Sequence, residues 1–206
     1  MSVGMVVLSA VAVLIFFGVL QRVLDRMYLT DRMALFLVAA MFVGTLLPPL
    51  DLGFAAVNIG GALIPLGICM YLWIKADEAK ERWRALIGSV LTAGAIFGLS
   101  VWLPDEPEAM WMDPNLIYGC AGGVIAWLLG RSRRAAFICG ITGVVLADIV
   151  TAVLNWRQGI DQKLVLGGAG IADTVVISGV LAVLLAELVG EITERIVRRR
   201  QKGEAK

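Results

Sequence analysis

The sequence predicts an all-α fold: a polytopic membrane protein with about seven transmembrane helices in a single domain, 1–206. Hydrophobic residues make up 59% of the 206 residues, whereas soluble domains are about half apolar. These residues are grouped in seven segments, most of which are long enough to cross ~30 Å of hydrocarbon. The charged residues, 17% of the chain, cluster between the segments.

The predicted spans are 3–21, 33–50, 57–74, 85–103, 115–130, 135–154 and 165–192, followed by a basic tail, 193–206. The first, within "MSVGMVVLSAVAVLIFFGVL", has no basic region before it and no convincing cleavage site. We therefore expect a transmembrane helix there and not a signal peptide. The fifth is short and rich in glycine, which fits either a tightly packed short span or a broken helix.

The loops predict the orientation of these spans. The segments "QRVLDRMYLTDR", "KADEAKERWR", "RSRR" and "RIVRRRQKGEAK" hold 16 of the 18 Lys and Arg residues, and they alternate with loops that hold only Arg157 and Lys163. The positive-inside rule then places the N-terminus outside and the C-terminus in the cytoplasm. We expect a prokaryotic plasma membrane. The basic tail either fixes this orientation or binds anionic lipid or a partner.

Several classes of function are not favoured by the composition. The net charge is +1, which gives no indication of nucleic-acid binding. The chain has no His, and its three Cys residues lie in apolar runs without a CxxC motif, so we expect no metal and no other cofactor. The expected partners are membrane lipids, and the sequence leaves a homo-oligomer open.

Two acidic residues stand apart from the loops: Asp148 in the sixth span and Asp173 in the seventh. A carboxylate within a span costs at least ~2–3 kcal/mol and usually faces the bundle interior or a wet cavity. The two residues lie at similar distances from the turn that joins their spans, so an antiparallel hairpin should set them side by side.

Small residues should let these two spans approach closely. Two carboxyl groups ~3 Å apart share a proton, so that one can accept a proton from water while the other polarises a carbonyl. Mostly small residues recur every four positions in both spans: Asp148 shares one such stripe with Ala136, Gly140, Val144 and Ala152, and Asp173 borders the other, Gly170, Thr174, Ser178, Ala182, Ala186 and Gly190.

Gly167, Gly168 and Gly170 precede Asp173, and they should weaken the start of the seventh helix. Loosened backbone at membrane depth is tolerated only beside protein or a wet cavity, and its free groups could pair with an extended peptide. Close helix packing explains the glycines equally well.

At these residues the chain resembles the intramembrane aspartyl proteases of the Gly-x-Gly-Asp type, the presenilin and signal peptide peptidase group. The matching positions are Asp148, and then Gly168 and Gly170 with Asp173, although Ile171 and Ala172 lengthen the motif to Gly-x-Gly-x-x-Asp. The resemblance implies a catalytic pair, Asp148 and Asp173, and a transmembrane peptide substrate.

That protease group also carries a Pro-Ala-Leu motif, and the segment of this chain most similar to it is "NIGGALIPLG". The resemblance implies that this segment shapes a substrate cleft. The implied substrate-binding residues are Asn58, Gly60, Gly61, Pro65, Gly168, Gly170 and Thr174. The whole chain is also similar to a family of uncharacterised prokaryotic membrane proteins, and that similarity implies no activity.

Two other functions remain open on the same residues. A proton- or cation-coupled transporter of small solutes would also use a buried acidic pair beside a broken helix, with Asn58 or Thr174 as further ligands. "NIGGALIP" and "VLGGAGIA" would then be traces of an internal repeat. A non-enzymatic membrane scaffold would use the acids only for structural pairing.

Overall fold

The computed structural model describes residues 24–25, 27–102, 114–130, 132–160, 163–170 and 173–204, with the backbone alone at 114–115 and 194–204. The predicted span 3–21 lies outside this part. The described chain is mostly helical. Its helices are α3 (Asp31–Leu46), α4 (Ile64–Ile74) with a preceding π-helix η1 (Ile59–Leu63), α5 (Ala79–Trp102), α6 (Pro114–Gly130), α7 (Arg133–Arg157) and α8 (Thr174–Glu204).

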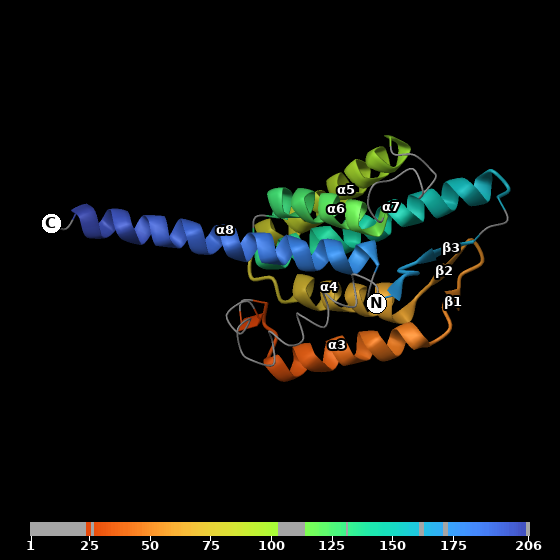
Figure 1. The fold of residues 1–206 in the computed structure, drawn as a ribbon, viewed down its shortest axis with the longest axis horizontal. Coiled ribbons are helices and arrows are strands. Elements are labelled where there is room, and N and C mark those ends of the chain that lie inside the picture. Colours follow the sequence, from red (N-terminus) through yellow and green to blue (C-terminus); the bar gives the residue numbers. More distant parts are fainter. Residues whose placement is uncertain are drawn as a thin grey trace.

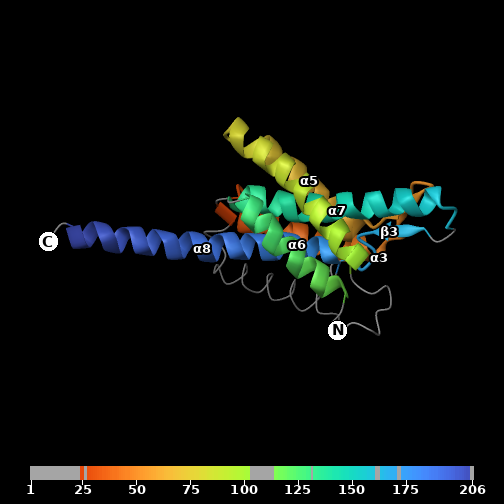
Figure 2. The ribbon, with the colours of Figure 1, turned by 90° about the horizontal axis from the view of Figure 1, so that it is seen from above.

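The helices form a bundle in which successive members run in alternate directions (Figures 1 and 2). Helices α5, α6, α7 and α8 pack against one another, and α4 joins them through α7 while α3 packs on η1 and α4. The C-terminal half of α8 projects beyond the rest of the bundle (Figure 1). The main hydrophobic core lies among α4, α5, α7 and α8, and residues 24–34 also contribute to it.

The helices correspond to six of the predicted spans. Within the described part of the chain, three helices are long and apolar enough to cross a membrane: Ala79–Trp102, Arg133–Arg157 and Thr174–Thr193. Apolar segments Ile59–Ile74 and Leu116–Gly130 are shorter. The predicted span 33–50 is too long, since α3 ends at Leu46, before Pro48 and Pro49. Proline lacks the backbone N–H that a helix interior requires.

A small sheet at one end of the bundle was not predicted by the sequence. It has the order β1 (Leu50–Asp51), β2 (Ala55–Val57) and β3 (Leu164–Leu166). Strands β1 and β2 are antiparallel, whereas β2 and β3 are parallel, with Ala56 opposite Val165. The prediction that a helical span begins at 165 is therefore wrong, because residues 164–166 pair with a strand more than 100 residues earlier in the chain.

Glycines allow three backbones to meet beside this sheet. A Cβ atom on Gly60 would lie 2.1 Å from the Met41 carbonyl oxygen, and a Cβ on Gly61 would lie 2.3 Å from the Gly167 carbonyl oxygen. Gly170 adopts a left-handed φ of +62° and packs on Thr45. We call the meeting of α3, η1 and the segment after β3 the glycine junction. Its contacts leave no room for side chains.

The described loops of the two predicted sets lie at opposite ends of the bundle (Figure 1). At the basic end, Arg134 forms salt bridges with Asp77 and Glu81, and the Tyr28 hydroxyl donates to Asp77 at 2.8 Å. The Tyr28 hydroxyl, and then Arg134, hold the pKa of Asp77 below its usual value. At the sheet end, Lys163 pairs with Asp51 at 2.6 Å. The segregation of loops is thus as the charge pattern indicated.

Close packing of α7 and α8 follows the predicted small-residue faces. A Cβ on Gly140 would lie 2.9 Å from the Ser178 carbonyl oxygen, and Ala136, Ala182 and Ala186 share one buried cluster. Gly170 is the exception among the predicted positions, because it lies before α8 begins.

We expect Gly60→Ala to lower the free energy of unfolding by about 1–3 kcal/mol or more, because the new methyl group would collide with the backbone of α3. Gly67→Ala is the matched control: its Cβ would meet nothing within 4 Å, and alanine favours the helix by about 0.5–1 kcal/mol. Thermal unfolding in detergent measures both. Equal melting temperatures for the two variants would contradict the glycine junction.

Candidate functional site

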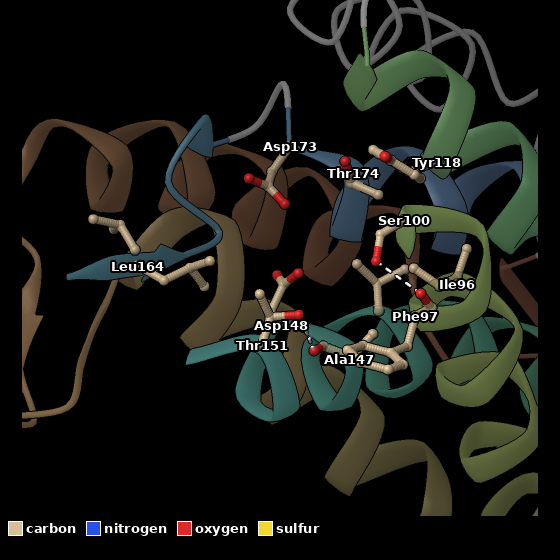
Figure 3. A pocket seen from close by; sticks show the side chains of 12 residues that line it. Ile96, Phe97, Ser100, Tyr118, Ala147, Asp148, Thr151, Leu164, Asp173 and Thr174 are labelled. Atoms are coloured by element: carbon tan, nitrogen blue, oxygen red, sulfur yellow. Dashed lines mark hydrogen bonds between the residues drawn. The ribbon is translucent and has the colours of Figure 1, made fainter. Parts of the chain in front are cut away.

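Asp148 and Asp173 line the same cavity, which has a volume of about 270 Å³. Their carboxylate groups point toward each other across it, one from α7 and the other from the start of α8 (Figure 3). The structure thus brings the two acids together on neighbouring elements, as the sequence predicted. The other lining residues are Ile96, Phe97, Ser100, Tyr118, Val144, Ala147, Thr151, Leu164, Val165 and Thr174.

Asp173 is the N-cap residue of α8, which begins at Thr174. Its Oδ1 accepts a hydrogen bond from the Val175 backbone N–H at 3.0 Å, and its Oδ2 accepts one from the Ala169 N–H at 3.1 Å. A capping carboxylate satisfies helix N–H groups that would otherwise lack partners, and it lies at the positive end of the helix dipole. The prediction that Asp173 lies inside a weakened helix is therefore wrong: it begins one.

The carboxylate of Asp148 has different surroundings. Asp148 lies within α7 and is half-buried, and no hydrogen bond joins its carboxylate to the described part of the chain. The nearby Thr151 hydroxyl donates instead to the Ala147 carbonyl oxygen, one turn back along the same helix. Asp148 and Asp173 are close enough to interact electrostatically. One carboxylate is thus held by backbone donors and the other is not.

The remaining predicted site residues are divided between the cavity and the glycine junction. Thr174 lines the cavity with the two acids, whereas Asn58, Gly60, Gly61, Pro65, Gly168 and Gly170 are not among its lining residues. Asn58 caps η1, since its Oδ1 accepts from the Gly61 N–H at 2.8 Å. Pro65 is buried where the π-helix gives way to α4. These residues support the backbone around the site, and their role in binding stays a prediction.

The two glycine-rich segments occupy corresponding places in the fold. Each follows one of two paired parallel strands, β2 or β3, but Gly60 and Gly61 lie within η1, after its cap Asn58, whereas Gly167 and Gly168 form a turn before the cap Asp173. "NIGGALIP" and "VLGGAGIA" therefore share a preceding strand but not the structure of their glycines, and the internal repeat stays a prediction.

Sequence reasoning missed the hydroxyl groups of Ser100 and Tyr118, which reach the cavity from α5 and α6. No motif connects these residues to the acids, and only the packing of the bundle brings them together. Thr151 could have been predicted as a lining residue, because it lies three residues after Asp148 and so on the same helical face.

A comparison with protein families identifies the class of this molecule. Residues 27–206 match the model of the YphA-like integral membrane protein family. The chain belongs to this family. It is therefore an integral membrane protein, as its apolar helices indicate. No curated protein and no solved structure matches the chain significantly. The family description names membrane integration and no activity, so the functional argument depends on the site.

We expect Asp173→Ala to lower the free energy of unfolding by about 1 kcal/mol, because α8 would lose its cap. Asp173→Asn should be milder, since the amide oxygen can still accept from the Val175 N–H. Thermal unfolding of both variants in detergent checks the difference. If Asn and Ala destabilise the protein equally, the capping oxygen is not what stabilises α8.

Proposed function

We propose that the protein hydrolyses peptide bonds of membrane-spanning substrates, with Asp148 and Asp173 as its catalytic pair. The observation that carries this proposal is the facing arrangement of the two carboxylates across a shared cavity (Figure 3). It supports the mechanism of an aspartyl protease, in which two neighbouring acids hold one proton between them.

The unequal surroundings of the two acids suggest their roles. Two backbone N–H donors and the start of α8 favour the negative charge on Asp173. Asp148 lacks such donors within the described chain, so it is the better carrier of the shared proton. This assignment makes Asp173 the general base and Asp148 the general acid.

The reaction follows from these roles. Asp173 takes a proton from a water molecule, whose oxygen attacks the peptide carbonyl carbon, while Asp148 donates its proton to the carbonyl oxygen. The tetrahedral intermediate then transfers a proton through the pair to the amide nitrogen, and the carbon–nitrogen bond breaks. A carboxylic acid and an amine leave the site, and the pair regains its single proton.

Strand β3 provides a binding surface for the substrate. It is the last strand in the sheet order, so one of its edges is unpaired with any described strand, and Leu164 and Val165 line the same cavity as the acids. An extended peptide can add to such an edge through backbone hydrogen bonds. The substrate helix would unwind locally before it binds, because a helix has no free backbone groups to offer.

The orientation of the site follows from the charge distribution. We propose seven spans with the N-terminus outside and the basic end of the bundle in the cytoplasm of a prokaryotic cell. The separation of the Arg134 cluster from the Lys163–Asp51 pair supports this orientation. The carboxylate pair, near the sheet, then lies toward the outer side of the plasma membrane, where cleavage would occur.

We expect Asp148→Asn and Asp173→Asn each to reduce cleavage of a single-span peptide by at least ~100-fold, because each removes a proton carrier. Purified protein in detergent, with products identified by mass spectrometry, provides the measurement. Asp51→Asn is the matched control, since it changes an exposed acid at the same end of the bundle. Wild-type cleavage by both of the first two variants would exclude the proposal.

A second candidate function is proton- or sodium-coupled transport. It is favoured by the oxygen-rich lining of the cavity, where the hydroxyl-bearing residues Ser100, Tyr118, Thr151 and Thr174 accompany the two carboxylates. Carboxylate and hydroxyl oxygens bind protons and hard cations, and a helix that starts inside a membrane protein is a common place for such a site.

For transport, we expect proteoliposomes to show a sodium or proton flux that Asp148→Asn abolishes, because the carboxylate that lacks hydrogen-bond donors would be the coupling group. A pH-sensitive dye and radioactive sodium report the two fluxes. Liposomes that are inert to both ions would contradict transport but not peptide hydrolysis.

A further inference from the structure

Two fully buried hydroxyl groups lie deeper in the bundle than the cavity. Thr92 and Ser178 each have 0% of their surface exposed, and neither Thr92 Oγ1 nor Ser178 Oγ has a hydrogen-bond partner in the described chain. A buried hydroxyl without a partner is unfavourable, so native proteins usually satisfy such a group with a bound water molecule. The two groups therefore indicate places where water is held.

Both hydroxyl-bearing residues are one helical turn from the cavity. Thr92 is four residues before Ile96 on α5, and Ser178 is four residues after Thr174 on α8, and Ile96 and Thr174 line the cavity. Ile96 also lies near Ser178, because a Cβ on Gly122 would lie 3.3 Å from Ile96 Cδ1 and 2.7 Å from Ser178 Oγ. The layer of the bundle that contains Thr92 and Ser178 thus adjoins the cavity that the two acids line.

Glycines keep this layer free of bulky side chains. A Cβ on Gly143 would lie 2.7 Å from Thr92 Cβ, and a Cβ on Gly140 would lie 2.9 Å from the Ser178 carbonyl oxygen. Thr92 and Ser178 therefore pack against the same turn of α7, from opposite neighbouring helices.

A further pair of hydroxyl groups, those of Ser89 and Thr142, lies on the side of Thr92 that faces the basic end. Ser89 Oγ and Thr142 Oγ1 share a hydrogen bond between α5 and α7, and Ser89 also donates to the Ala85 carbonyl oxygen at 2.7 Å. Eight residues before Ser89 on α5 lies Glu81, which accepts from the Ser132 hydroxyl at 2.6 Å and pairs with Arg134. Glu81 thus marks the basic end of this face of α5, ~12 Å along the helix from Ser89, with the buried Ala85 between them.

The whole series follows one face of α5. Glu81, Ser89, Thr92 and Ser100 follow one another at steps of eight, three and eight residues, which keeps them on a single helical face. At 1.5 Å per residue, the face extends ~28 Å from Glu81 to Ser100, which is close to the thickness of the hydrocarbon core. Polar groups therefore recur along the full depth of the bundle.

We propose that this hydroxyl column is a proton path between the basic end and the carboxylate cavity, completed by water bound at Thr92 and Ser178 and by water in the step between Ser89 and Glu81. Each hydroxyl or water accepts a proton on an oxygen lone pair and releases another proton to its neighbour, so no group is consumed. The path would exchange the proton of Asp148 with the aqueous phase at the basic end. It does not depend on peptide hydrolysis, because transport or catalysis could use the same proton.

The test is proton uptake into proteoliposomes under an imposed potassium diffusion potential, followed with an internal pH dye. The wild-type protein should take up protons faster than protein-free liposomes, because the half-buried Asp148 and the exposed Val165 show that the cavity reaches the protein surface. Thr92→Val and Ser178→Ala should each slow uptake about tenfold, whereas Thr92→Ser should retain it. Thr193→Val is the control, since it removes an exposed hydroxyl from α8.

Two results would overturn the proposal: no uptake by the wild-type protein above protein-free liposomes, or unchanged uptake by Thr92→Val and Ser178→Ala. Thermal unfolding verifies that each variant is folded, and Ser178→Ala decides the matter if Thr92→Val does not fold. A rise in melting temperature together with unchanged uptake would mean that these hydroxyls hold no water. Because peptide cleavage is measured separately, failure here leaves the proposed hydrolysis unaffected.

Discussion

The parallel pairing of β2 with β3 is the constraint on which the site depends. It brings two segments more than 100 residues apart to the same end of the bundle, and it fixes where α4 and α8 begin. Buried backbone groups require hydrogen-bond partners, and the strand pairing and the capping side chains of Asn58 and Asp173 supply them. The glycine junction lets these backbones approach closely enough for the pairing to form.

The N-cap role of Asp173 changes how its charge is interpreted. A carboxylate in the middle of a membrane helix would need a functional explanation, whereas a capping carboxylate already has a structural one. The cap does not account for Asp148, which has no hydrogen-bond donor in the described chain and faces Asp173 across a cavity. The functional argument thus depends on Asp148 and on the geometry that it forms with a fixed partner.

Small and hydroxyl-bearing residues serve two purposes in the four-helix core. Gly140, Ala136 and Ala182 allow α7 and α8 to pack closely, which membrane helices achieve with small side chains. Packing alone does not require the buried hydroxyls of Thr92 and Ser178, because alanine or valine would fill the same space without a polar group. Helix packing therefore does not explain these two hydroxyl groups, whereas the proposed proton path does.

The sequence by itself determined the membrane class, the positions of most helices, the separation of the described basic loops from the other described loops, and the facing of Asp148 and Asp173. These features follow from hydropathy, charge and helical spacing, which are local properties of the chain. Only the tertiary structure decided that 164–166 is a strand, that Asp173 caps α8, and that Ser100 and Tyr118 reach the cavity. The strand and the cavity each require partners that are distant in sequence. The cap depends on the turn that contains Gly167 and Gly170, and the sequence alone is equally consistent with a weak helix at these glycines.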